Sequence, residues 1–119
     1  MDLQLASLND LEKIKEIEDY TNKYPWSLNN FKSSLNAGNS SVVLREEGRI
    51  LGYAFFSVIE TDSHLLNITV SKDYQRNGYG KKILERVIFQ SKVLGATIIF
   101  LEVRLGNQRA INFYERYGF

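Results

Sequence analysis

Gly78 and Gly80 stand among basic and amide side chains in "QRNGYGKK", residues 75–82. Glycine adopts backbone conformations that other residues avoid, and it lets a ligand approach the main chain. If a helix begins here, its first N–H groups lack intrahelical acceptors and its dipole adds partial positive charge. Arg76 and Lys81 add formal charge. The segment therefore predicts an anion site suited to a phosphate or pyrophosphate.

Two phosphate-binding motifs can be compared with this loop. A Walker loop is excluded, because Leu84 stands where that motif requires lysine. The dinucleotide fingerprint G-x-G-x-x-G fits at Gly78 and Gly80, but Ile83 at the third position would block close packing of helix and strand. Glu102 lies about 20 residues on, where a ribose-binding acid would stand, so the dinucleotide interpretation stays open. A glycine loop without any ligand is the remaining alternative.

Composition narrows the function classes. The 119 residues are 44% hydrophobic and 24% charged, which indicates a single globular domain that spans residues 1–119. The net charge is +1 and the basic residues are scattered, so no nucleic-acid partner is expected. The absence of cysteine removes disulfides, thiolate nucleophiles and cysteine metal sites, although a serine nucleophile stays open. His64 has no second histidine to form a metal pair and is assigned to a solvated turn, so no metal is expected.

Neither a signal sequence nor a membrane segment is indicated. The N-terminus has no apolar h-region, and no apolar run approaches membrane-spanning length. A cytoplasmic protein without a membrane partner is therefore expected.

The first half of the chain predicts strands on either side of two helices. Residues 2–7 alternate like a short strand, and an apolar stripe from Leu8 to Ile17 indicates a helix that Pro25 ends. Ser7 with Asp10 resembles a capping arrangement, and Ser27 can cap a second helix over 28–37. A hairpin is predicted over 41–60, with its turn around Gly48, and a further strand over 64–71.

The second half predicts a strand–helix–strand unit over 65–104, whose strands should be parallel. Its helix runs to about Leu94, and its second strand, 97–104, is almost continuously apolar, which predicts burial on both faces. A last helix begins at Asn107 and ends at Gly118. With the antiparallel hairpin, this order predicts a mixed sheet in an α/β or α+β layered fold.

Four segments resemble the GNAT acetyltransferase superfamily. Gln75, Gly78 and Gly80 fill its coenzyme-A loop pattern [QR]-x-x-G-x-[GA], and "LLNITV" resembles the strand before that loop. "YPWS" and "LEVRLGNQRAINFYERYGF" resemble the bacterial RimI-like branch, which acetylates the N-terminal α-amine of a ribosomal protein. The resemblance covers nearly the whole chain. It implies a mixed, mostly antiparallel sheet flanked by helices, with a central parallel β-α-β unit that binds acetyl-CoA.

The resemblance also implies residue roles. The pantetheine arm and acetyl group would pair with backbone groups as an added strand would, and a loop would wrap the pyrophosphate. Glu102 resembles the general base and Tyr114 the general acid. The implied cofactor-binding residues are Ile68, Thr69, Val70, Arg76, Asn77, Gly78, Tyr79, Gly80, Lys81 and Asn107.

The implied chemistry is direct attack of an amine on the thioester of acetyl-CoA. A lysine has a pKa about 2.6 units above that of an α-amine, which adds roughly 3.5 kcal/mol to deprotonation, so one carboxylate suits an α-amine better. Glu102 would need burial or a water relay, and its neighbours Leu101 and Val103 predict partial desolvation. A Tyr114 hydroxyl near pKa 10 could protonate a thiolate near 8.5 at modest cost.

Each role has a structural alternative. Glu102 could be an ion-paired residue at a strand end, and Arg104 on the same strand face could compete for it. Tyr114 could be an aromatic core residue, and Trp26 is interpreted as a packing residue more than as a substrate contact.

The chain departs from the family at its end, because family members continue for a few more strands that help to close the acceptor groove. An unpaired edge at 97–104 predicts self-association, or disorder near the C-terminus. The expected acceptor is a protein or peptide N-terminus, most simply that of a ribosomal protein. A small-molecule amine, an internal lysine, or a module that binds acetyl-CoA with little turnover are the alternatives.

Overall fold

A five-stranded mixed sheet forms the centre of the computed structural model, which describes residues 1–103 and 106–119. The strands lie in chain order; the first three pairings are antiparallel and the fourth is parallel. This confirms the predicted mixed sheet, with its antiparallel hairpin and parallel strand–helix–strand unit. The strands are β1 (Asp2–Gln4), β2 (Ser40–Glu46), β3 (Arg49–Ile59), β4 (Asp62–Val70) and β5 (Ile98–Leu101).

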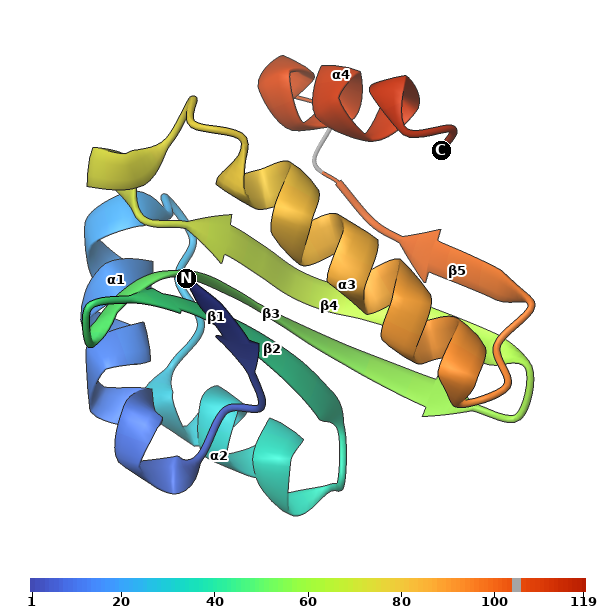
Figure 1. Cartoon of the computed structure of the whole chain (residues 1–119), viewed down its shortest axis with the longest axis horizontal. Helices are drawn as coiled ribbons and strands as arrows, with labels where there is room; N and C mark the ends of the chain where they lie inside the picture. Colours follow the sequence, from blue (N-terminus) through green and yellow to red (C-terminus); the bar gives the residue numbers. More distant parts are fainter. Residues whose placement is uncertain (104–105) are drawn as a thin grey trace.

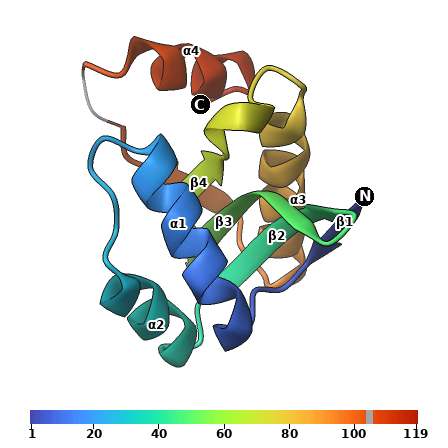
Figure 2. The ribbon, with the colours of Figure 1, turned by 90° about the vertical axis from the view of Figure 1, so that its left-hand side faces the viewer.

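The helices lie in layers on the two faces of the sheet. Figures 1 and 2 show α1 and α2 on one face and α3 on the other, with α4 at the top beside the segment that leads into α3. The helices are α1 (Leu11–Thr21), α2 (Leu28–Asn36), α3 (Tyr79–Val93) and α4 (Gln108–Arg116), with 3-10 turns η1 (Leu8–Asp10) and η2 (Lys72–Tyr74).

Local sequence sets most helix boundaries. The backbone N–H of Ser7 donates to Asp10 Oδ2 at 2.9 Å, and the Ser27 hydroxyl accepts from the N–H of Asn30 at 3.1 Å, so both predicted caps form. The prediction that Pro25 ends the first helix is wrong. That helix ends at Thr21, because Asn22 already has an extended backbone (φ −102°, ψ 137°).

The side chains of β3 divide between two apolar cores. Tyr53 and Phe55 pack towards α1 and α2, whereas Ala54 and Phe56 pack towards α3. All four are fully buried, as the alternating geometry of a central strand requires. Both layers of helices are therefore fixed to the same strand.

Gly52 in β3 lies where the Ile83 side chain of α3 and the backbone of β4 both come close to the strand. A Cβ at this position would lie 2.7 Å from the carbonyl oxygen of Thr69 and 2.8 Å from Cδ1 of Ile83, so no side chain fits. The glycine thus lets α3 approach the C-terminal end of β4. Glycine is required here by contacts within the protein and not by a ligand, and the sequence alone did not indicate it.

β5 differs from its prediction. The strand ends at Leu101, before Glu102 and Val103, and residue 104 of the prediction lies outside the described residues. Ile98 and Phe100 are 47% and 44% exposed. The predicted burial on both faces is wrong, because β5 pairs only with β4 among the described residues and so lies at the edge of the sheet. His64 lies in β4 and not in a turn, with its ring stacked on Phe100 at 5.2 Å.

Candidate functional site

The parallel strands β4 and β5 separate partway along their length. Their pairing ends at Leu65 with Leu101, while β4 continues to Val70. The backbone N–H of Ser71 donates to the carbonyl of Leu51 at 2.8 Å, so the backbone groups of Ser71 face β3. Because these groups alternate along a strand, those of Thr69 also face β3, and those of Ile68 and Val70 face the other edge. That edge has no strand partner in the described part of the chain.

A cavity of about 610 Å³ continues from this edge, between the loop before α3 and the inner side of α4. It brings together most of the predicted cofactor-binding residues, but Thr69 and Asn77 do not line it. The backbone of Thr69 faces β3, and Asn77 Nδ2 donates to the carbonyls of Tyr74 and Gln75 within the loop. The predicted residues that line the cavity are Ile68, Val70, Arg76, Gly78, Tyr79, Gly80, Lys81 and Asn107.

The loop turns into α3 at Gly78, whose φ of 79° lies in the left-handed region that favours glycine. The first helical bond runs from Lys82 N–H to the Gly78 carbonyl at 3.3 Å. Within the described ranges, the backbone N–H groups of 76–81 donate to no protein acceptor. These amides are therefore available to an anion in the cavity.

Four cations surround the cavity. Arg76 and Lys81 come from the loop and α3, as predicted, and Arg109 and Arg116 come from α4. No described acid pairs with the three arginines, and Lys81 lies 4.0 Å from Glu85. The α4 arginines were missed, although a seven-residue spacing places both on one helix face and could have indicated them.

A second cavity of about 720 Å³ adjoins the first and contains both predicted catalytic side chains, Glu102 and Tyr114. Glu102 directly follows β5 and is exposed, so the predicted partial desolvation is absent. The edge position of β5 explains this exposure. No described basic side chain is ion-paired with Glu102, and the proposed competitor Arg104 lies outside the described residues.

Tyr114 lies where the two cavities meet. Its ring is partly buried against Phe113 and Phe119, and burial raises its pKa to about 12. Complete proton transfer to a thiolate with a pKa near 8.5 would therefore be uphill by about 5 kcal/mol. A hydrogen bond from Tyr114 to a leaving sulfur fits this environment better than complete transfer does. The residues that line both cavities are Asn22, Ile68, Asn107, Ala110 and Tyr114.

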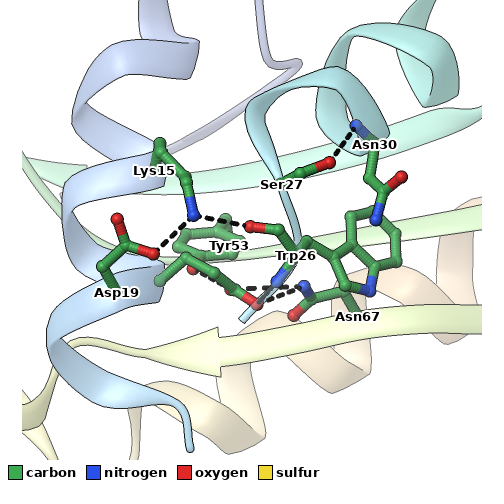
Figure 3. A network of polar contacts seen from close by, with 8 residues as sticks. Lys15, Asp19, Trp26, Ser27, Asn30, Tyr53 and Asn67 are labelled. Atoms are coloured by element: carbon green, nitrogen blue, oxygen red, sulfur yellow. Dashed lines mark hydrogen bonds and ion pairs between the residues drawn. The ribbon is translucent and has the colours of Figure 1, made fainter. Parts of the chain in front are cut away.

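The second cavity also holds Glu18, a carboxylate that the sequence interpretation missed. Glu18 is 1% exposed. Its oxygens accept from the Tyr53 hydroxyl at 2.5 Å, from the backbone N–H of Trp26 at 3.0 Å, and from Asn67 Nδ2 at 3.2 and 3.3 Å. Figure 3 shows Tyr53, Trp26 and Asn67 gathered between α1 and the sheet. Spacing could have revealed Glu18, because it continues the buried stripe that starts at Leu11.

Both Tyr53 and Trp26 have packing roles beside this carboxylate. Burial, and then the negative charge of Glu18, raise the pKa of Tyr53 far above its ordinary value. The Trp26 ring packs on Phe31 at 5.1 Å, as predicted, and also lines the second cavity.

Neither a metal centre nor a membrane span is indicated by the described part of the chain. There, no three His, Cys, Asp or Glu side chains are grouped so that they could hold a metal ion. None of the helices described is long and apolar enough to cross a bilayer.

Comparison with known proteins agrees with this geometry. The family model for GNAT acetyltransferases matches residues 5–119. The chain is 34% identical over 110 residues to the ribosomal protein bS18-alanine N-acetyltransferase of Escherichia coli K12, covering 92% of this chain and 74% of that protein. The crystal structure of the Escherichia coli enzyme has a TM-score of 0.92 and 32% identity, covering 98% of this chain and 76% of that one.

Ard1 from Thermoplasma volcanium also has a TM-score of 0.92, covers 99% of this chain and 81% of its own, and is 22% identical, which shows the fold alone. The family match and the Escherichia coli relative go further than fold. The chain belongs to the GNAT family and is an N-acetyltransferase that takes its acetyl group from acetyl-CoA.

Proposed function

We propose that this chain acetylates the N-terminal α-amine of a protein by direct attack of the amine on acetyl-CoA. The observation that carries the proposal is the meeting of two cavities at Tyr114, one rich in cations and free amides, the other containing Glu102. The relatives named for acetylation of ribosomal protein bS18 support a ribosomal N-terminus as the acceptor. Such an acceptor would be met in the cytoplasm.

The first cavity is proposed to hold the cofactor. The outward backbone groups of Ile68 and Val70 would pair with the pantetheine arm, although Gln75 Nε2 already donates to the Val70 carbonyl at 3.0 Å. The amides of 76–81 would bind the pyrophosphate, assisted by charged side chains of the loop and α4. Asn107 caps α4 through its bond from Ala110 N–H at 3.2 Å and would contact the cofactor from there.

The second cavity is proposed to receive the amine. Because Glu102 is exposed, it would accept the amine proton directly or through a water relay. Tyr114 stays protonated at neutral pH and would donate to the leaving sulfur.

A peptide panel tests the acceptor class. We expect acetyl transfer to peptides with a free N-terminus, and none to the same peptides with a blocked N-terminus and an internal lysine. Mass spectrometry of the product locates the acetyl group. Modification of lysine, or of a small amine only, would contradict the proposal.

A second candidate is a module that binds acetyl-CoA with little turnover. The exposure of Glu102 among the described residues favours it, since a base that is not shielded from water contributes less to catalysis. Calorimetric binding of CoA without transfer to any amine on the panel would establish this candidate.

We also propose self-association through the edge of β5 that pairs with no strand among the described residues. Ile98 and Phe100 are exposed there, and an unpaired strand edge can pair with another chain. Light scattering should detect a dimer, and Ile98→Lys should shift it to monomer. A monomer at all concentrations of the unmodified chain would contradict this proposal.

A further inference from the structure

Asn22 lies at the C-terminal cap of α1, on the wall that both cavities share. Its Nδ2 donates to the hydroxyl of Thr69 at 3.0 Å, while no donor among the described residues is bonded to its Oδ1. Nδ2 of Asn22 is thus held by Thr69, and Oδ1 remains available as an acceptor where the two cavities meet. A chain of hydrogen bonds within the protein fixes this orientation.

The orientation begins at Glu18, three hydrogen bonds away. Tyr53 O–H, Trp26 N–H and Asn67 Nδ2 all donate to it, which matches a carboxylate, a group that offers acceptors only. Asn67 must therefore present its NH2 to Glu18. Its carbonyl oxygen consequently points to Thr69, whose hydroxyl donates to it at 2.9 Å.

Thr69 passes the orientation on to Asn22. Its hydroxyl has a single proton, which Asn67 Oδ1 takes, so the hydroxyl can only accept from a further neighbour. Asn22 therefore has to present Nδ2 to Thr69 and turn Oδ1 away from it. Thr69 is 4% exposed, so water does not readily replace either bond.

We propose that Asn22 Oδ1 accepts an N–H of the attacking amine and orients its lone pair towards the thioester carbon. Glu18, Asn67 and Thr69 are positioning residues that hold this acceptor. The inference deepens the proposed function and rests on it: an acceptor amine must enter the second cavity and meet acetyl-CoA beside Asn22.

The step balances without Asn22 gaining or losing a proton. The amine nitrogen forms the new bond to the acetyl carbon, the carbon–sulfur bond breaks, and sulfur keeps the electron pair. The amine proton leaves through Glu102 or its water relay, and the thiolate is stabilised by the Tyr114 hydroxyl. A carboxamide oxygen is too weak a base to take that proton, so Asn22 orients the amine and Glu102 deprotonates it.

A matched pair at Thr69 tests the proposal. Thr69→Val keeps the shape and removes the hydroxyl, whereas Thr69→Ser keeps the hydroxyl. Losing one neutral hydrogen bond should lower kcat roughly 3- to 10-fold in Asn22→Ala and in Thr69→Val, with CoA affinity unchanged. Thr69→Ser should recover the rate that Thr69→Val loses.

Two further kinetic readouts separate orientation from simple structural damage. The double variant of Asn22→Ala and Thr69→Val should be no slower than either single variant, because both remove the same oriented acceptor. The pH profile of kcat should keep its shape, since none of the altered groups titrates.

A third readout needs no acceptor. The side-chain amide NMR signals of Asn22 should shift in Thr69→Val and stay in place in Thr69→Ser, with Asn22→Ala giving the assignment. If the wild-type chain acetylates no N-terminus, the proposed function fails while this spectrum still tests the orientation. Equal rates or equal spectra in the two Thr69 variants would overturn the inference, as would an Asn22→Ala variant that weakens CoA binding without lowering kcat.

Discussion

Glu18 and Glu102 are two carboxylates of one cavity in opposite surroundings. Glu18 is 1% exposed and accepts from three donors, whereas Glu102 is exposed and is ion-paired with no described side chain. The oxygens of Glu18 are already occupied by protein donors, whereas those of Glu102 can meet an incoming amine or a bridging water. The contrast assigns orientation to the first group and proton acceptance to the second.

The largest expected effect concerns the exposed member of the pair. Glu102→Gln should lower kcat by about 10²- to 10⁴-fold, the usual contribution of a general base, and leave CoA binding unchanged. Steady-state kinetics on a free N-terminal peptide, with calorimetry for CoA, measure both. Glu12→Gln, on the exposed side of α1, is the matched control. An unchanged kcat in Glu102→Gln would remove the general base from the proposed mechanism.

The buried member should matter more for stability. Glu18→Ala leaves the Tyr53, Trp26 and Asn67 donors without their acceptor, so we expect a loss of about 3 kcal/mol in the free energy of unfolding. Urea denaturation measures it. Glu102→Ala should change that free energy by less than about 0.5 kcal/mol, because the side chain is at the surface. Similar losses in both variants would contradict the contrast between the two carboxylates.

The packing of α3 on β3 and β4 positions the first cavity, and Gly52 in β3 tests that packing. A methyl group there would collide with Thr69 O and Ile83 Cδ1, so Gly52→Ala should cost about 1–3 kcal/mol of unfolding free energy and weaken CoA binding. Gly106→Ala is the control for stability, because no described atom lies within 4 Å of its added Cβ. Thermal denaturation and calorimetry compare the two variants. Wild-type stability in Gly52→Ala would show that α3 has room to move.

Local patterns predicted the parts of the site that follow from short-range geometry. The glycines and basic residues before α3 indicated an anion site, since a helix start and its charges lie within a few residues. The resemblance placed Glu102 and Tyr114, and the structure brings both to one cavity.

The parts that sequence reasoning missed depend on contacts between distant segments. Glu18, Asn67 and Asn22 are hydrogen-bonded through partners up to 49 residues apart. The spacing along α1 indicates that Glu18 is buried, but no local pattern indicates which donors it meets. The exposure of β5 was missed for the same reason. An apolar run predicts a buried strand, and only the strand order shows that this one lies at the edge of the sheet. Gly52 was missed because its steric neighbours come from β4 and α3.

The smallest expected effect is the change of stability with pH that Tyr53, beside Glu18, and Tyr114, between the two cavities, should cause. Burial raises the pKa of Tyr114 to about 12, while burial and the charge of Glu18 together raise that of Tyr53. A folded-state pKa above the unfolded value of about 10 gives stability that is complete below pH 10 and falls above it, by up to about 1.4 kcal/mol per pH unit for each tyrosine.

Alkaline denaturation should therefore steepen above pH 10, and Tyr53→Phe or Tyr114→Phe should each reduce that slope. Glu18→Gln separates the causes, because it removes the charge that acts on Tyr53 and leaves the burial of Tyr114 intact. Tyrosinate absorbance should then show one buried tyrosine titrating at lower pH and the other unchanged. Since Tyr114 lies at the meeting of the cavities, a parallel shift of both would mean that the buried carboxylate reaches the reaction centre electrostatically, in addition to the chain of hydrogen bonds that ends at Asn22.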